Sequence, residues 1–527
     1  MSAHRTLATA GLVVSGMFLI SRVLGWVRTF VIVDAFGVGR DLDIFNAAFR
    51  LPDLIFQLVA AGALSSALIP VVSGLLASDE ESRAFRVVST VTNVMLALLL
   101  GLAVVAFFLA PVIVPAITPG FVPDPDKMTR TIELTRIMLL SPIFLAVGAV
   151  ATSLLNARGR FAASAIAPIV YNIAIIGGAL LLKPSLGVAG LAVSVVLGSL
   201  SHVLVQVPSI LGLGYRHRLG VDLDDPQARR ALTLMVPRAI GLGVTQITFI
   251  VATAIATDFG DGALSAYQLA FVLLQIPLGV IGVPLGVVML PALSREAATG
   301  NVVEFAGLVS RALRLLLFVM LPIAGLGIVL AGDLVHLLFG GGRSSPATLD
   351  QTAATLVTFL LGLAAHALIA VLARAFYAQQ DTRTPVAAGI VAVAFNTTLA
   401  IILTKQAGLG LPGIGLAIAI GAWIEAILLL VLLERRSPEL ALVPIGLVAV
   451  RSLAATIVAS VVTLGIAGGL GLMGSDEPTK FVLLVRMTVA GGVGLLTYLG
   501  LAAVLRIPEL PSIVGVMVDL VRRPRQA

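Results

Sequence analysis

The chain has 527 residues, of which 59% are hydrophobic and 12% are charged, and its mean hydropathy is +1.09. Because a soluble protein of this length carries about a quarter charged residues, the composition excludes an ordinary soluble enzyme and indicates a polytopic, all-α membrane protein. The absence of cysteine excludes disulfides, thiolate metal sites and a cysteine nucleophile. The net charge of +7 is better explained by arginines between apolar segments than by nucleic acid binding.

Apolar segments long enough to cross a bilayer recur from one end of the chain to the other. Hydropathy and helix breakers predict fourteen spans, and the first is read as a retained helix because Arg22 and Arg28 interrupt any signal-like core. The segment 507–520 is expected to be an interfacial amphipathic piece. The predicted spans cover residues 8–36, 46–76, 86–116, 132–156, 161–182, 187–212, 231–257, 263–293, 304–331, 350–378, 385–405, 411–434, 447–472 and 480–506.

Arginine side chains concentrate in alternate connections between these spans. The outer connections hold mostly single charges, such as Arg40, Lys183 and Arg343. The positive-inside rule therefore predicts that both termini face the cytoplasm, which requires an even number of spans. With that orientation, the inner connections hold Arg83, Arg86, Arg158, Arg160, Arg216, Arg218, Arg229, Arg230, Arg295, Arg383, Arg435 and Arg436.

The sequence contains an internal repeat. The segment ALIPVVS parallels VMLPALS, which places Pro70 and Pro291 221 residues apart. The segment LNARGRFAASAIAPIVYN parallels FYAQQDTRTPVAAGIVAVAFN, with the same separation between Ala157 and Ala378. A repeat of six spans predicts two parallel six-helix lobes related by a pseudo-two-fold axis along the membrane normal, which is typical of transporters that work by alternating access.

The repeat also sets the expected domain limits. We expect the N-terminal lobe at 1–213 and the C-terminal lobe at 214–440. Residues 441–527 then supply two further transmembrane helices and a short basic cytoplasmic tail. No connection is long enough to form a soluble domain.

Two arginines lie within the first apolar span. Arg22 lies about 20 Å into that span, where an unpaired charge costs at least about 2.5 kcal/mol, so it must face protein or water. Arg28 follows about 9 Å further along the axis and about 120° around it. A cavity that binds an anionic group is one interpretation. The alternatives are an internal pair with a carboxylate for Arg22 and snorkelling to the outer surface for Arg28.

The start of the second span carries a polar face. Asp43 and Asn46 are three residues apart, Asn46 and Arg50 four, and Arg50 and Asp53 three, so all can lie on one side of a helix that Pro52 should kink. An acidic group here could hold the arginines of the first span when no substrate is bound. Simple structural ion pairs are the alternative.

These segments together resemble a known family. The stretch from SRVLGWVR through FGVGRDLDIFNAAFRLPDL to AAGALSSALIPV is similar to the opening of the MurJ (MviN) family of lipid II flippases, within the multidrug/oligosaccharidyl-lipid/polysaccharide exporter superfamily. Further matches continue to about residue 440, and the family's fourteen spans and two lobes agree with the hydropathy and the repeat. These matches are TPGF, LNARGRFAASAIAPIVYN, VTQITFI, LGVVMLPALSREAATGN and RAFYAQQDTRTPV.

The resemblance implies a transporter and not an enzyme. It would move undecaprenyl-pyrophosphate-linked peptidoglycan precursor (lipid II) from the inner to the outer leaflet of the cytoplasmic membrane, for cell wall synthesis and cell shape. The family's cavity arginines match Arg22 and Arg28, and its acidic position matches Asp43. With Asn46, Arg50 and Asp53, these residues form the expected substrate-binding set. Arginine suits bidentate recognition of a pyrophosphate.

The chain departs from the family at several positions. Thr29 replaces an acidic residue, and family arginines fall at Phe56 and about Val272. These departures keep open a related exporter of another prenyl-linked saccharide or an amphipathic drug. A non-transporting scaffold for wall-synthesis enzymes is a third hypothesis. The arginines that could compensate are Arg50, Arg136, Arg238, Arg314 and Arg374.

The remaining expectations concern energy and partners. Some family members bind sodium, which suggests a cation site at Asp381, Asn396 and Thr397. A turn in a cytoplasmic loop is the simpler explanation for Asp381. A sodium ion or the membrane potential would be the energy source, with no resident cofactor. The histidines are too scattered for a metal site, and no phosphate-binding loop indicates ATP hydrolysis. Expected partners are lipid II, membrane lipids and the cell-wall synthesis machinery. The protein is expected to be a monomer.

Overall fold

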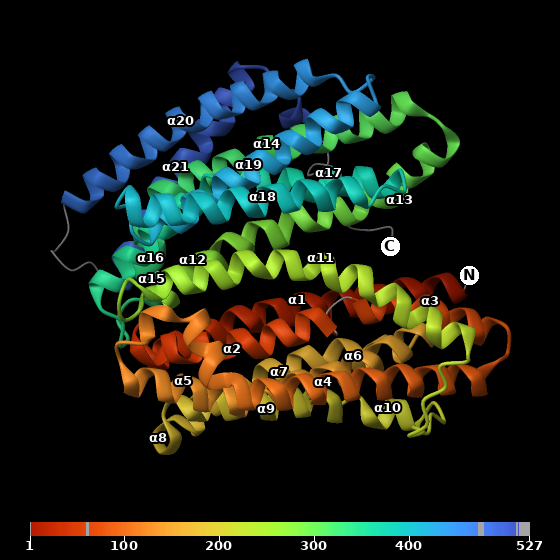
Figure 1. The fold of residues 1–527 in the computed structure, drawn as a ribbon. Coiled ribbons are helices and arrows are strands. Elements are labelled where there is room, and N and C mark those ends of the chain that lie inside the picture. Colours follow the sequence, from red (N-terminus) through yellow and green to blue (C-terminus); the bar gives the residue numbers. More distant parts are fainter. Residues whose placement is uncertain (1, 60–62, 473–478, 513–514, 516–527) are drawn as a thin grey trace. The chain divides into compact units, whose positions relative to one another are not determined.

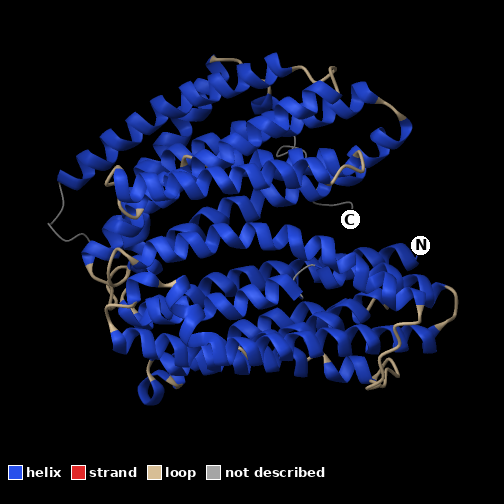
Figure 2. Ribbon diagram, viewed as in Figure 1, coloured by secondary structure: helices blue, strands red, loops and turns tan. Residues whose placement is uncertain are grey.

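A computed structural model describes residues 2–59, 63–472, 479–512 and 515 of the chain (Figure 1). Every regular element in these ranges is a helix (Figure 2), which confirms the predicted all-α class. Most of the expected amphipathic piece after residue 512, and the basic tail, lie outside the described residues. The described chain forms two compact units. The first extends to Ser265 and includes Gly341–Ser345, and the second holds the rest.

The first unit contains the N-terminal helices and α11. Within it, α7 lies against both α1 and α9, and α11 packs on α2, α3 and α4. Its elements are α1 (Ser2–Phe36), α2 (Arg40–Val59), α3 (Ala63–Ala77), α4 (Glu81–Ile117), the 3₁₀ helix η1 (Pro119–Phe121), α5 (Pro125–Met138), α6 (Ser141–Ala157), α7 (Phe161–Leu181), α8 (Lys183–Leu186), α9 (Val188–Leu204), α10 (Val207–Leu211) and α11 (Pro226–Thr257).

The second unit begins within α12. In it α14 packs against α20, α20 against α21, and α18 against α19. Its elements are α12 (Ala263–Pro277), the π-helix η2 (Leu278–Gly282), α13 (Val283–Thr299), α14 (Val302–Val329), α15 (Ala331–Phe339), α16 (Pro346–Leu360), α17 (Leu363–Ala378), α18 (Arg383–Ile401), the π-helix η3 (Ile402–Gln406), α19 (Pro412–Arg436), α20 (Leu442–Leu472) and α21 (Lys480–Val504).

Several predicted spans are interrupted helices. The span 263–293 contains a π-turn directly after Pro277, whose ring removes a backbone donor from the helix. The span 350–378 is bent by 45° between α16 and α17. Among the described residues, ten helices are long and apolar enough to cross a membrane, or eleven with that bent pair. The predicted spans 8–36, 46–76 and 231–257 each include residues whose side chains are not described, so the count of fourteen stays a prediction.

Helix α4 shows how the first unit is built. Val87, Val91, Met95 and Leu99 recur at a spacing of four and are buried in one cluster with residues of α2, α3, α6 and α11. The C-terminal half of the same helix exposes large apolar side chains such as Phe108, which is 71% exposed. An exposed apolar surface of this extent is expected where a helix faces lipid.

The predicted final two helices pack closely on α14. Gly325 lies against Thr456 of α20, and Gly494 of α21 lies against Thr463, so that a side chain at either glycine would collide with its neighbour. Small residues at such contacts let membrane helices approach each other. The Tyr498 hydroxyl of α21 donates to the Phe318 carbonyl of α14 at 2.6 Å. The domain limits at 213 and 440, which follow the sequence repeat, stay a prediction.

Candidate functional site

The two arginines of α1 lie in the middle of a 35-residue helix. Arg22 is exposed and Arg28 is half-buried, as expected for residues on different sides of the helix. In the described part of the chain, neither guanidinium forms a hydrogen bond or an ion pair with another residue. At 1.5 Å per residue, Arg22 lies about 21 Å from the end of α1 at Phe36. The structure therefore holds two guanidinium groups without a hydrogen-bond partner among the described residues, on a helix that the sequence predicts to span the membrane.

A second polar group lies beside Arg28. The hydroxyl of Tyr171, on α7, lies within electrostatic reach of both Arg28 and Asp53 of α2. The Asp53 carboxylate accepts a long hydrogen bond of 3.4 Å from the Gln57 side-chain amide. Arg28 of α1 and Asp53 of α2 thus lie within electrostatic reach of one neutral hydroxyl on α7. The sequence pattern did not reveal Tyr171.

Arg50 connects α2 to α11. Its guanidinium Nε donates to the Thr253 hydroxyl at 3.1 Å, and its Cζ lies 5.6 Å from the ring centre of Phe249. The side chain is only 8% exposed. Because these contacts engage the guanidinium, Arg50 stabilises the packing of α2 on α11.

Asp43 is fully buried, and its carboxylate forms three hydrogen bonds and one ion pair. Its carboxylate accepts from the backbone N–H groups of Gly262 and Ser265 at 2.7 and 2.9 Å and from the Ser265 hydroxyl at 2.7 Å. Lys127 Nζ lies 3.3 Å away. The side chain thus caps the first turn of α12, whose N–H groups have no helical partner. The Asn46 amide also donates to the Ser265 hydroxyl, at 3.2 Å, as expected for one polar face.

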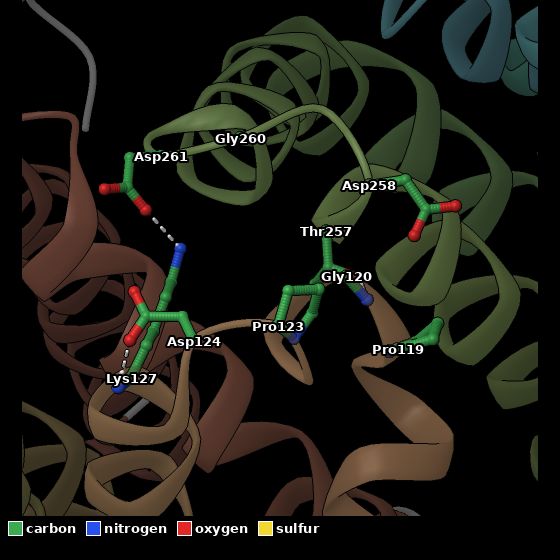
Figure 3. Close-up of a pocket in the computed structure, with 9 residues that line it drawn as sticks. All are labelled: Pro119, Gly120, Pro123, Asp124, Lys127, Thr257, Asp258, Gly260 and Asp261. Atoms are coloured by element: carbon green, nitrogen blue, oxygen red, sulfur yellow. Dashed lines mark hydrogen bonds and ion pairs between the residues drawn. The ribbon is translucent and has the colours of Figure 1, made fainter.

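A pocket of about 410 Å³ lies at this end of the first unit (Figure 3). Lys127 Nζ is 2.6 Å from Asp261 and 3.9 Å from the ring centre of Phe121, so its ammonium is held by two carboxylates and an aromatic face. The pocket is lined by Pro119, Gly120, Pro123, Asp124, Lys127, Thr257, Asp258, Gly260 and Asp261.

Arg40 completes the charges around this pocket. Its guanidinium contacts Asp124 through two nitrogens, one of them at 2.9 Å, and Asp126 at 3.1 Å. The Arg40 hydrogen bond holds the pKa of Asp124 well below its usual range, and the same pair raises the pKa of Arg40. Asp124 also caps α5 by accepting from the Lys127 N–H at 3.0 Å. We call Arg40, Asp43, Asp124, Asp126, Lys127 and Asp261 the end cluster.

Sequence reasoning found only part of the end cluster. The run DPDK signals a helix start at α5, because Asp is a common N-cap and Pro a common first residue. Nothing in the sequence placed Lys127 beside Asp43, which lies 84 residues earlier in the chain.

The residues of the predicted cation site lie apart. Asp381, in the turn before α18, accepts from the Arg383 and Thr384 N–H groups at 2.9 and 3.0 Å and from the Thr384 hydroxyl at 2.6 Å, and it pairs with Arg436; the hydrogen bonds from Thr384 and then Arg436 hold its pKa well below the usual range. Asn396 and Thr397 lie within α18, about 20 Å from its start. The structure therefore does not bring the three side chains together, and no cluster of metal-ligating side chains occurs among the described residues.

The expected compensating arginines are mostly engaged elsewhere. Arg136 donates to the Phe107 carbonyl at 3.0 Å, Arg314 pairs with Glu509 at 3.1 Å, and Arg374 donates to the Ala370 carbonyl at 2.5 Å. The side chain of Arg238 lies outside the described part of the structure. Phe56 packs against the core of the first unit, as its apolar side chain requires.

Comparison with known proteins gives a consistent result. The family model for lipid II flippase MurJ matches residues 32–471. A probable lipid II flippase MurJ from Rhizobium tropici is 32% identical over 97% of this chain and 95% of its own. One from Rhizobium meliloti (strain 1021) is 35% identical over 81% of this chain and 80% of its own.

Solved structures share the fold. A lipid II flippase MurJ in an inward closed conformation superposes with a TM-score of 0.76 at 21% identity, over 94% of this chain and 98% of that chain. An inward-facing multidrug resistance MATE transporter of the MOP superfamily superposes at 0.65 with 16% identity, over 79% and 94%. The family model covers most of the chain, and the Rhizobium tropici relative matches almost all of it. The chain belongs to the MurJ family of lipid II flippases.

Proposed function

We propose that this protein moves lipid II from the inner to the outer leaflet by alternating access, with Arg22 and Arg28 binding the pyrophosphate. Its apolar helices and its family indicate a multi-pass protein of the bacterial inner membrane. The observation that carries the proposal is the pair of guanidinium groups on α1 without a protein partner among the described residues. Keeping such charges in a membrane span is costly unless a ligand or water meets them.

The chemistry of the substrate fits these two groups. A pyrophosphate carries at least two negative charges, and each guanidinium can donate two parallel hydrogen bonds to phosphate oxygens. A charge-assisted hydrogen bond is worth about 1.5–3 kcal/mol, so each arginine accounts for about 10- to 100-fold in affinity.

The other predicted substrate-binding residues support this site indirectly. Asp43 and Asn46 hold α2 against the start of α12, and Arg50 holds α2 against α11. We assign them a positioning role, because their polar atoms already have protein partners. Asp53 remains the α2 residue that can respond to an anion bound at Arg28.

The membrane potential supplies a driving force for this transport. The inside-negative potential favours outward movement of an anion, by about 2.3 kcal/mol per charge and 100 mV. We propose the potential as an energy source in preference to a sodium site at Asp381, Asn396 and Thr397, which lie apart.

The proposal includes an orientation and an assembly state. Both termini lie in the cytoplasm, supported by the arginines of the alternate connections, and the protein works as a monomer alongside the cell-wall synthesis machinery. Because the chain has no cysteine, single cysteines introduced at Arg216 and Arg343 can be labelled with an impermeant thiol reagent in whole cells. Labelling from outside should occur at residue 343 and not at 216, and the reverse pattern would overturn the orientation.

The function is tested with lipid II in proteoliposomes containing the full chain. Arg22→Ala should abolish flipping while the protein still inserts and melts normally. Arg311→Ala is the matched control, since Arg311 forms an exposed pair with Glu304. Flipping retained by Arg22→Ala would contradict the role of Arg22. Flipping of another prenyl-linked saccharide but not lipid II would favour the related exporter.

A further inference from the structure

A single acidic residue lies at the midpoint of α19. Glu425 is thirteen residues after Pro412 and eleven before Arg436, in a helix whose apolar window has a mean hydropathy of 2.6. At 1.5 Å per residue, the carboxyl is therefore about 20 Å from the start of the helix. The glutamate side chain is too short to extend from there to the water at either end of the span.

Glu425 faces α18. A Cβ at Gly389 of α18 would lie 3.7 Å from Glu425 Oε1, so the carboxyl rests against the backbone of that helix. Gly421, one turn earlier on α19, lies against the side chain of Asn396. The backbone N–H groups of α18 are used within the helix and cannot donate to the carboxyl.

Glu425 has no hydrogen-bond or ion-pair partner among the described residues, and its side chain is half-buried. The elements packed against α19 do carry other charges, but none of these pairs with Glu425. The titratable and charged side chains are Asp350 on α16, His366, Arg374 and Tyr377 on α17, Arg383 on α18, Lys405 on η3, and Glu434, Arg435 and Arg436 on α19 itself.

Three buried or half-buried acids elsewhere in the described chain pair with a basic residue. Asp43 contacts Lys127, Asp333 contacts Arg486 at 2.7 Å, and Glu509 contacts Arg314. Glu425 departs from this pattern at the depth where an unpaired charge is most costly. An ionisable residue kept at this depth without a counter-ion indicates a function that depends on its neutral and charged forms.

We propose that Glu425 is a proton-binding site that is loaded and released during the transport cycle. One proton adds to the carboxylate to give a neutral carboxylic acid, and the same proton leaves when the site meets water on the other side. The neutral acid is compatible with the closed α18–α19 contact, whereas the ionised form requires water at that contact. The inference rests on the proposed transport function but not on which lipid is moved.

The surroundings favour a proton over a metal cation. A hard cation needs several oxygen ligands, as in sites built from carboxylates and free carbonyls. The backbone carbonyls of α18 beside Glu425 are used in the helix, and the described residues hold no group of acidic or histidine side chains that could share an ion. One carboxyl is sufficient for one proton.

Proton binding can be measured beside the site itself. The chain has two tryptophans, and Trp423 lies two residues from Glu425, with its indole N–H donating to the Leu361 carbonyl at 2.9 Å. In a Trp26→Phe background, Trp423 emission of the full chain in nanodiscs should titrate with pH as one proton binds. Glu425→Gln should remove this transition, and Glu434→Gln, near the end of the same helix, should keep it. An unchanged transition in Glu425→Gln would overturn the proposal.

A transport assay tests the same site independently. In proteoliposomes, one pH unit of gradient should change the lipid II flipping rate of the unmodified protein by up to about tenfold. Glu425→Gln should flip at a rate that no longer responds to the gradient, and Glu425→Asp should respond. A response to sodium in place of pH would overturn the proton assignment. Loss of flipping in Arg22→Ala under every gradient tests the proposed function separately.

Discussion

The charged side chains of the end cluster are paired with each other, whereas the two arginines of α1 are not paired among the described residues. In the end cluster Lys127 contacts Asp43 and Asp261, Arg40 contacts Asp124, and Asp43 also caps α12. On α1, Arg22 and Arg28 form no hydrogen bond or ion pair with another described residue, although Arg28 lies within electrostatic reach of Tyr171. Paired charges hold helices of the first unit together, and unpaired charges remain available for a ligand. Stability should therefore depend on the first region and substrate binding on the second.

The largest effect on stability is expected at Lys127. Lys127→Ala removes the cation from the fully buried Asp43 and should cost about 3–5 kcal/mol of unfolding free energy, as for a broken buried ion pair. Thermal melting of the purified protein in detergent measures this. Combining Lys127→Ala with Asp43→Asn should recover part of the loss, because the buried charge is then gone. A loss below about 1 kcal/mol, as for a surface pair, would contradict the assigned role.

The opposite behaviour is expected at Arg28. Arg28→Gln should weaken lipid II binding by about 10- to 100-fold, the value of one charge-assisted contact. Its melting temperature should stay that of the unmodified protein, since no described ion pair is lost. Lipid II binding is measured by native mass spectrometry, and the melting temperature is measured on the same preparation. A lower melting temperature with unchanged binding would reverse the comparison for this residue.

The smallest effect is a pH dependence from the end cluster. The folded pKa of Asp124 lies below the unfolded value of about 3.9, so its contribution to stability is present above that pH and is lost as the pH falls through the folded pKa. Melting temperature should therefore decline below about pH 4. Asp124→Asn should reduce this decline, whereas Asp224→Asn, at an exposed carboxylate outside the cluster, should leave it unchanged. An identical decline in Asp124→Asn would exclude a contribution from Asp124.

Local patterns explain which features the sequence could predict. Hydropathy located the helices, and the apolar run around Arg22 correctly placed this residue within a long helix. The role of Arg22 in substrate binding stays a prediction. The spacing of Asp43 and Asn46 correctly placed both on one face of α2, where both contact Ser265. These inferences depend on neighbours within one helix.

Long-range pairings could not be predicted in the same way. Asp43 and Lys127 are 84 residues apart, and no spacing rule connects a helix start to a lysine on another helix. Asp381, Asn396 and Thr397 had suitable side chains, but Asp381 lies before α18 and the other two lie about 20 Å from its start. Glu425 did carry a signal, because it is a lone acid in an apolar span, and such a residue indicates function by itself.

The most direct test is lipid II binding to the purified full chain, compared between the unmodified protein, Arg22→Ala and Arg311→Ala. Other prenyl-pyrophosphate glycans serve as competing ligands. We expect Arg22→Ala to bind lipid II at least about tenfold more weakly, with unchanged melting, and Arg311→Ala to bind normally. Equal binding of lipid II by all three proteins would contradict the central claim that the unpaired arginines of α1 hold the pyrophosphate.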